Sequence, residues 1–208
     1  MGYQFNLDTE AAETEQSSGG ALDTGVYGAT IEHISISQTK NGNNMANISF
    51  KTDNGMNATV YGICMDKTWK SGAENFDYAK WNRIAALCGL KTGETITKKL
   101  FKEDGSPVMK DGSQIELEIF KESVNSKVKF AIQLVYDAYN GNAKEKNEIY
   151  EVFTADGKTY NENNANQPAE KLDKIKSRLK DKKTKEYEKL MSADGIPAST
   201  QDDDDDIL

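Results

Sequence analysis

The sequence has few of the residues that build disulfide scaffolds and metal centres. It contains two cysteines, Cys64 and Cys88, and one histidine, His33, among 208 residues. Two cysteines are too few for a disulfide framework, and a zinc site would need acidic ligands to complete its four positions. We therefore expect both cysteines to be buried as small apolar side chains, and we expect no metal or other cofactor.

Long apolar runs and catalytic motifs are also missing. No stretch approaches the roughly 20 apolar residues that a membrane helix needs, and the first residues are acidic where a signal peptide is basic. These absences predict a soluble protein in a reducing, intracellular compartment. The chain has no glycine-rich phosphate loop and no HExxH, CxxC or GxSxG motif, so we expect a protein that is not an enzyme. One alternative is a metal-dependent nuclease that uses Glu116 and Glu118, which would share one face of a strand.

Charge is distributed unevenly along the chain. The net charge is −8, hydrophobic content is 37% and charged content is 29%. Residues 1–23 hold five acidic and no basic residues, whereas residues 168–192 hold nine basic and five acidic residues. The low hydrophobic content predicts unpacked ends. The body between them is nearly neutral, so basic residues can be concentrated on one of its faces. An acidic net charge therefore does not exclude binding to nucleic acid.

Alternating apolar residues predict a series of strands and one helix. In residues 24–37 the apolar parity changes near Glu32 and His33, which predicts a bulge in a long, bent strand. Asn-Gly turns precede two further strands, and a helical pattern follows them. The strands are expected at residues 24–37, 46–50, 57–65, 115–120 and 128–134, with the last two forming a hairpin, and the helix at residues 75–90. Residues 91–112 are expected to be a loop, residues 137–147 are polar, and residues 148–153 are expected to form a further short strand.

The chain divides into four parts. We expect a flexible N-terminal arm at residues 1–23, a folded domain at 24–153, a linker and charged helix at 154–201, and a tail at 202–208. Five consecutive aspartates repel one another, so the tail should be extended. Ile207 and Leu208 end it with two apolar side chains, which suits a charged segment that docks its tip in a partner protein. A plain solubility tail is the alternative.

The order of the predicted elements indicates a fold. Three strands, one helix and two strands, with turns between neighbours, form the layout of the five-stranded oligonucleotide-binding (OB) fold, a small Greek-key barrel. The predicted class is therefore mainly β. A split sandwich with the same number of strands is the rival architecture.

The tail and the body together resemble the bacteriophage single-stranded-DNA-binding proteins. The matching features are the acidic tail with its apolar tip, at residues 202–208, and the layout of residues 24–137. The resemblance implies a protein that coats single-stranded DNA in replication, recombination and repair, in the cytoplasm of a bacterial host. It also implies a tail that recruits partner proteins and competes with DNA for a basic groove. The charged helix at residues 168–192 has no counterpart in this resemblance.

An OB groove stacks bases on aromatic side chains while lysines follow the phosphates. Trp69, between Lys67 and Lys70, is the strongest aromatic candidate, although it could instead fold back and cap the barrel. Tyr61 could face either the groove or the core. The expected DNA contacts are Trp69, Lys67, Lys70, Tyr61, Lys40, Lys51, Phe120, Lys121, Lys127 and Lys129. The expected partner-binding residues of the tail are Asp202, Asp203, Asp204, Asp205, Asp206, Ile207 and Leu208.

A second function class stays open. The chain could be a protein-interaction or chaperone-like module whose tail and basic helix bind protein and no nucleic acid. The two classes differ in whether a single strand binds at any salt concentration. The sequence leaves open whether the chain forms a homo-oligomer.

Overall fold

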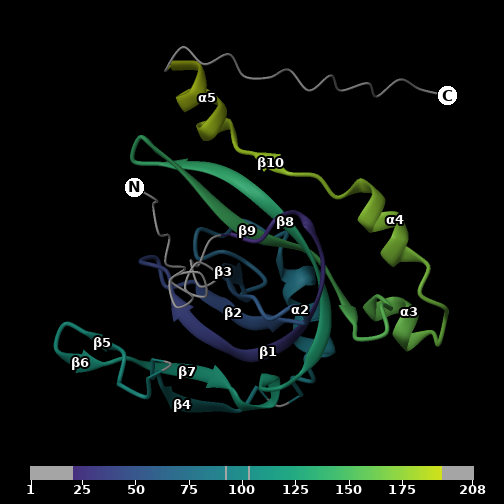
Figure 1. Ribbon diagram of the computed structural model, residues 1–208, viewed down its shortest axis with the longest axis horizontal. Coiled ribbons are helices and arrows are strands. Elements are labelled where there is room, and N and C mark those ends of the chain that lie inside the picture. The colour runs from purple at the N-terminus through teal and green to yellow at the C-terminus, as the bar shows by residue number, and fades with distance from the viewer. Residues whose placement is uncertain (1–20, 92, 103, 194–208) are drawn as a thin grey trace, which may run out of the picture.

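The computed structural model describes residues 21–91, 93–102 and 104–193 (Figure 1). Within these ranges the chain is mainly β, as predicted, with one large sheet and few helices. The strands are β1 (Gly25–Gln38), β2 (Asn44–Thr52), β3 (Asn57–Cys64), β4 (Thr95–Lys99), β5 (Met109–Lys110), β6 (Ser113–Gln114), β7 (Glu116–Phe120), β8 (Lys127–Tyr139), β9 (Asn142–Thr154) and β10 (Lys182–Lys183). The helices are α2 (Tyr78–Leu87), α3 (Tyr160–Asn164), α4 (Lys171–Arg178) and α5 (Lys185–Ala193). The predicted arm up to residue 20 and the predicted tail at 202–208 lie outside the described residues.

β1 pairs with other strands on both of its edges. One edge pairs with β2 along most of its length, and the other pairs first with β8 and then, at Ser35, with Ile119 of β7. The resulting order β9–β8–β1–β2–β3 is antiparallel throughout. At the two ends of this order β9 lies beside β3, but no ladder joins them in the described part of the chain. The antiparallel sheet is confirmed, whereas a closed five-stranded barrel stays a prediction.

The predicted bulge in β1 is confirmed. The register with β2 shifts between Ile31 and His33. Ile31 pairs with Phe50 before the shift and Ile34 pairs with Ile48 after it, and all four side chains are completely buried. The extra residue therefore keeps apolar side chains on the core face on both sides of the bulge.

The predicted helix is α2, which packs on the core through Trp81 and Ile84. Gly89 follows its C-terminal end. Gly89 has φ 79°, and the N–H groups of Gly89 and Leu90 donate to Ala86 O (3.1 Å) and Ala85 O (2.9 Å). This is the Schellman arrangement, which satisfies carbonyls that the helix itself leaves unpaired.

The predicted hairpin between residues 115–120 and 128–134 is wrong. β7 pairs with β4, whereas β8 pairs with β9. A 3₁₀ turn at Lys121–Ser123, in which Ser123 is buried, directs the two strands along one edge of β1 instead of against each other. Ser123 Oγ in this turn accepts from the N–H of Ile34 (3.2 Å), and the N–H of Asn125 donates to Ile31 O (2.8 Å). The alternation identified each strand correctly, but it did not identify the neighbours.

A segment that was expected to be a loop and a polar segment that was not assigned to a strand both contain strands. β4 and β5 lie within residues 91–112, and β5 pairs with β6, which follows directly after them. Figure 1 shows β5 and β6 projecting from the body. The polar residues 137–147 belong to the long hairpin of β8 and β9, which also includes the short strand expected at 148–153. Pairing along the whole of β8 compensates for the low β propensity of this polar stretch.

The charged helix predicted over residues 168–192 is divided into two. α4 ends at Arg178, and β10 then runs parallel to β8 before α5 begins. Gln133 Nε2 donates to Lys180 O (2.7 Å), and the N–H of Thr184 donates to Tyr136 O (2.9 Å). These bonds to the edge of β8 take the place of helical ones. α3 likewise lies in the stretch expected to be a linker.

Glu162 joins α3 to the start of α4. Its buried carboxylate accepts hydrogen bonds from the N–H and Oγ1 of Thr159 (2.8 Å each). It also accepts from the N–H groups of Glu170 (3.1 Å) and Lys171 (3.0 Å). Burial raises the pKa of Glu162, but these hydrogen bonds outweigh burial and hold the pKa below its usual value. Glu162 therefore fixes where α4 begins.

We expect Glu162→Gln to destabilise the protein, because an amide cannot accept all four hydrogen bonds. The expected loss in free energy of unfolding at neutral pH is about 1–3 kcal/mol, measured by urea unfolding. The folded-state pKa is lowered, so the stabilisation is complete above the unfolded pKa of about 4.3 and disappears as pH falls through the folded value. The difference between wild type and variant should therefore shrink in acid. Glu170→Gln, at an exposed position, is the control, and equal stability of Glu162→Gln and wild type at pH 7 would disprove this anchor.

Candidate nucleic-acid interface

The outer face of β1, β2 and β3 is polar, whereas their inner face forms the core. Ser49 on β2 pairs with Thr59 on β3, and their hydroxyl oxygens lie 3.0 Å apart. Two residues further along β2, Lys51 pairs with Thr30 on one side and Asn57 on the other. Paired residues of an antiparallel ladder project to the same side of the sheet. The face therefore presents hydroxyl, amide and amine groups away from the core.

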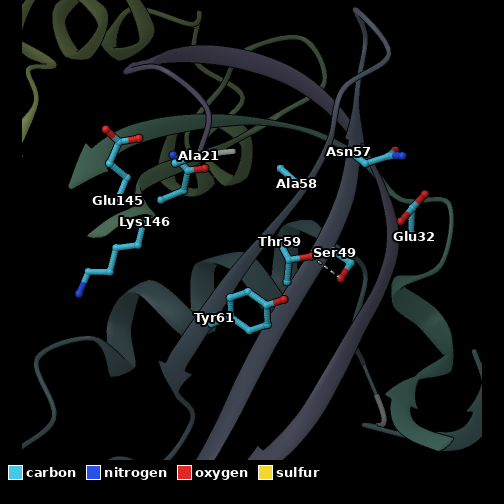
Figure 2. Close-up of a pocket in the computed structure, with 10 residues that line it drawn as sticks. Ala21, Glu32, Ser49, Asn57, Ala58, Thr59, Tyr61, Glu145 and Lys146 are labelled. Carbon is cyan, nitrogen blue, oxygen red and sulfur yellow. Dashed lines mark hydrogen bonds between the residues drawn. The ribbon is translucent and has the colours of Figure 1, made fainter. Parts of the chain in front are cut away.

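A hollow of about 380 Å³ lies over this face (Figure 2). Ser49 and Thr59 contribute to its floor, and residues 145–147 of β9 form the opposite wall. Asn147 also fixes the start of the described chain. The N–H of Leu22 donates to Asn147 Oδ1 (2.8 Å), and Asn147 Nδ2 donates to Leu22 O (2.8 Å). An open hollow with polar walls suits an extended polar ligand better than a small apolar molecule.

Tyr61 lies where this hollow meets a second one, and its side chain is 74% exposed. A bulge in β3 places it there. The register with β2 shifts between the pairs Ile48↔Val60 and Ala46↔Ile63, so β3 has one extra residue. Gly62 has φ 78° within this bulge, a conformation that glycine adopts at little cost. Tyr61 is thus an exposed ring beside the hollows, one of its two predicted placements.

The second hollow, of about 330 Å³, lies between β3 and β9 and has lysines on its walls. These lysines are paired with acids. Lys146 Nζ lies 2.9 Å from Asp137 and 3.5 Å from Glu148, and Lys182 Nζ lies 3.0 Å from Glu148. Hydrogen bonds from Lys146 and Thr184 lower the pKa of Asp137 to about 2. The network attaches β10 and α5 to the hairpin, and it leaves this hollow without a strong net charge.

Four of the predicted residues come together in two adjoining loops. Asn43 is buried in the turn between β1 and β2, and its Oδ1 accepts from the N–H of Lys70 (2.7 Å). This bond holds the loop with Lys67, Trp69 and Lys70 against the turn that contains Lys40. Trp69 is half-buried and lies outside the main core cluster. The three lysines are exposed, and none of them forms an ion pair with another described residue.

Two further predicted lysines lie on one row of the outer face. Lys127 of β8 and Lys51 of β2 pair with the same β1 residue, Thr30, from its two sides. Both side chains are exposed. Lys129 follows two residues later on the same face of β8 and is half-buried beside Gly157. The row connects the hollow near β3 with the opposite side of β8.

Phe120 is not available for base stacking, so that prediction is wrong. Its side chain is 6% exposed, and its ring centroid lies 5.8 Å from that of Trp81. The end of β7 lies against α2, which turns the phenylalanine into a core residue. Its neighbour Lys121 is exposed, and its Nζ lies 3.4 Å from Glu94.

The two glutamates considered for a metal-dependent nuclease each have a partner of their own. Glu116 is 3.6 Å from Lys99 Nζ, and Glu118 Oε1 accepts from Thr95 Oγ1 (2.8 Å). His33 is buried, its Nδ1 has no hydrogen-bond partner among the described residues, and burial lowers its pKa. The described residues contain no group of three or more His, Cys, Asp or Glu side chains that could hold a metal ion.

The two cysteines are buried, as predicted, and burial raises the pKa of Cys88 to about 12. Neither thiol therefore resembles a reactive nucleophile. Across the described ranges, no helix has the length and apolar character needed to cross a membrane.

The exposed tip of the β8–β9 hairpin was not predicted from the sequence. Lys144 Nζ lies 5.0 Å from the ring centroid of Tyr139, which is 65% exposed. Asn140 and Gly141 form the turn with φ 51° and 75°. Positive φ at both central residues is typical of the type I′ hairpin turn, which favours Asn-Gly. This dipeptide was the signal that could have predicted the hairpin.

Comparisons with known proteins identify no relative: no protein-family model matches the sequence, and no curated protein matches it. The interface is therefore interpreted from the residues that form it. Its parts are the polar face with Tyr61, the loop cluster around Trp69 and the lysine row on β2 and β8.

We expect Asn43→Ala to loosen the loop that contains Trp69, because the variant removes the acceptor for the N–H of Lys70. Amide hydrogen exchange should accelerate across residues 67–73, by about tenfold if the lost bond contributes about 1.4 kcal/mol. Exchange in β4 and β7 should not change. Asn41→Ala, at an exposed position of the same turn, is the matched control. Unchanged exchange in Asn43→Ala would show that other contacts hold the loop.

Proposed function

We propose that the protein binds single-stranded DNA without catalysing a reaction. The observation that best supports this proposal is the 74% exposed ring of Tyr61 beside polar hollows on a curved β surface. Proteins that bind single strands without sequence preference stack bases on such rings. Tyr61 has no packing role in the core, so its ring is free to act in this way.

The lysines supply the second part of the proposal. Lys40, Lys67 and Lys70 lie in the two adjoining loops that also contain Trp69, while Lys51 and Lys127 lie on the row across the outer face. Lysines that form no ion pair with another described residue can neutralise phosphates and release counterions, which makes binding salt-dependent. In this arrangement Tyr61 and Trp69 stack bases, and the lysines follow the backbone between them. The curved sheet would act as an OB-like barrel.

The biological setting belongs to the same proposal. The protein would coat single-stranded DNA during phage-type replication, recombination and repair in the cytoplasm of a bacterial host. Without DNA, the aspartates at residues 202–206 would occupy the unpaired lysines. DNA would displace them and free Ile207 and Leu208 to recruit partner proteins.

One observation favours a second candidate, a protein-interaction or chaperone-like module. Lys146 and Lys182 in the second hollow are neutralised by Asp137 and Glu148. A hollow with balanced charge suits a polar peptide as well as a nucleic acid. This candidate requires that no single strand binds at any salt concentration.

Tyr61→Ala tests the proposed stacking. In titrations of a fluorescent oligo-dT, its affinity should fall by about 1–3 kcal/mol, or about 5- to 150-fold. Tyr61→Phe should bind like wild type, because it keeps the ring. Phe101→Ala removes a 60% exposed ring outside the proposed interface and is the matched control. If wild type fails to bind at low salt, the protein-interaction module becomes the better explanation.

Truncation after Gln201 tests the competition by the tail. The truncated chain should bind oligo-dT more tightly than the full chain, and the gain should be largest at low salt, where charges are least screened. Replacing the five aspartates with asparagine keeps the length and should reproduce the gain. Replacing Ile207 and Leu208 with serine should leave DNA affinity unchanged. Equal affinity of the truncated and full chains would remove the competition from the proposal.

A further inference from the structure

The most basic stretch of the described chain has no role in the interface described above. Residues 171–183, from the start of α4 to the end of β10, contain seven basic and two acidic side chains. Lys171, Lys174 and Arg178 are exposed, and none of them forms an ion pair with another described residue. In a chain of net charge −8, a basic surface without internal acidic partners favours an anionic ligand.

This basic surface is held in place by the body. Glu162 accepts hydrogen bonds from the N–H groups of Glu170 and Lys171 at the start of α4. Leu172 lies so close to Gly157 that a Cβ there would be 3.0 Å from Leu172 Cδ2. Leu172 and Ile175 are half-buried on the side of α4 that faces the body. The basic side chains are therefore displayed on a positioned helix.

Lys171, Lys174 and Arg178 share one side of α4. Positions three, four and seven apart in a helix are neighbours on its surface. This side flanks the stripe of Leu172 and Ile175, which is turned to the body. The three cations thus form one continuous basic edge.

The lysine row leads from the hollow to this helix. Asn57 lines the hollow and pairs with Lys51, and Lys127 lies on the far side of β1 in the same row. Three strand spacings separate Asn57 from Lys127, a distance of about 14 Å. Lys129 comes next, with its Nζ 3.8 Å from the position of a Cβ on Gly157, the same position that Leu172 of α4 approaches. Two exposed lysines, Lys51 and Lys127, and the half-buried Lys129 thus follow one another from the hollow towards α4.

We propose that α4 is a second contact zone, which binds the sugar–phosphate backbone of a single strand that leaves the groove along the lysine row. The inference rests on the proposed function, and it adds a second zone that only strands longer than the groove can reach. No stacking is involved at α4, because none of its exposed side chains is aromatic. Binding there should depend on salt and on strand length, and not on the base sequence.

The test uses the full chain with Lys171, Lys174 and Arg178 all replaced by glutamine. Binding is measured for oligo-dT of about 6 and about 20 nucleotides, one within and one beyond the roughly 4–16 nucleotides of a single OB fold. For the long oligonucleotide, the slope of log K against log salt should become shallower by about 2, since each phosphate contact contributes about 0.7. The loss of affinity should then be roughly 15- to 20-fold greater at about 50 mM than at about 200 mM salt. The short oligonucleotide should bind as it does to wild type.

The matched control removes three exposed lysines elsewhere, by the replacements Lys102→Gln, Lys110→Gln and Lys189→Gln. It should keep the wild-type slope for both oligonucleotides. An α4 variant that binds the long oligonucleotide with the wild-type slope would overturn the second zone and leave the proposed function intact. An equal loss for short and long oligonucleotides would overturn it as well. If wild type binds neither oligonucleotide, the proposed function fails, and the inference fails with it.

Discussion

The pairing of β1 on both of its edges is the constraint on which the rest of the structure depends. β2 occupies one edge, and β8 and β7 share the other, so every other part of the sheet is attached through this strand. The bulge between Ile31 and His33 allows the strand to bend without moving its apolar side chains off the core face. It also keeps Thr30 and Ser35 in register with both neighbours. The outer face is polar as a consequence, because successive side chains of a strand alternate between the core and the outer face.

The alternation of apolar and polar residues made much of the fold predictable from the sequence. The bulge in β1, the second and third strands, the helix and the buried cysteines follow from local patterns, and the structure agrees with them. The pairing of the strands with one another could not be predicted from these local patterns. Alternation in residues 115–120 defines a strand and its two faces, but its neighbour is decided by the turn at Ser123 and Asn125, which bonds to β1. Phe120 was misplaced for the same reason, because its burial depends on Trp81 from a distant helix.

The C-terminal part shows a tertiary contact that overrides helix propensity. The apolar stripe of Leu172, Ile175 and Leu179 is followed by a purely polar stretch before Tyr187. A continuous helix there would have no apolar face to bury, while β8 has an edge beyond the end of its pairing with β1 that can accept hydrogen bonds. The extended conformation at β10 satisfies that edge, and Tyr187 then packs against Tyr136 with ring centroids 5.6 Å apart. The polar gap in the apolar stripe indicated that the helix could be interrupted. That the interrupted segment would pair with the edge of β8 could not be read from the sequence.

Ion pairing divides the lysines into two groups that differ in how readily they can bind a phosphate. Lys146 and Lys182 have acidic partners within 3.5 Å and attach the C-terminal segment to the hairpin. An incoming phosphate would have to compete with those carboxylates, and the pairs, although partly exposed, contribute up to about 1 kcal/mol each. Lys51 and Lys127 have no such partner among the described residues, so a phosphate at these positions displaces only water and counterions. An anionic strand should therefore follow the unpaired row rather than the second hollow, even though that hollow also has lysines on its walls.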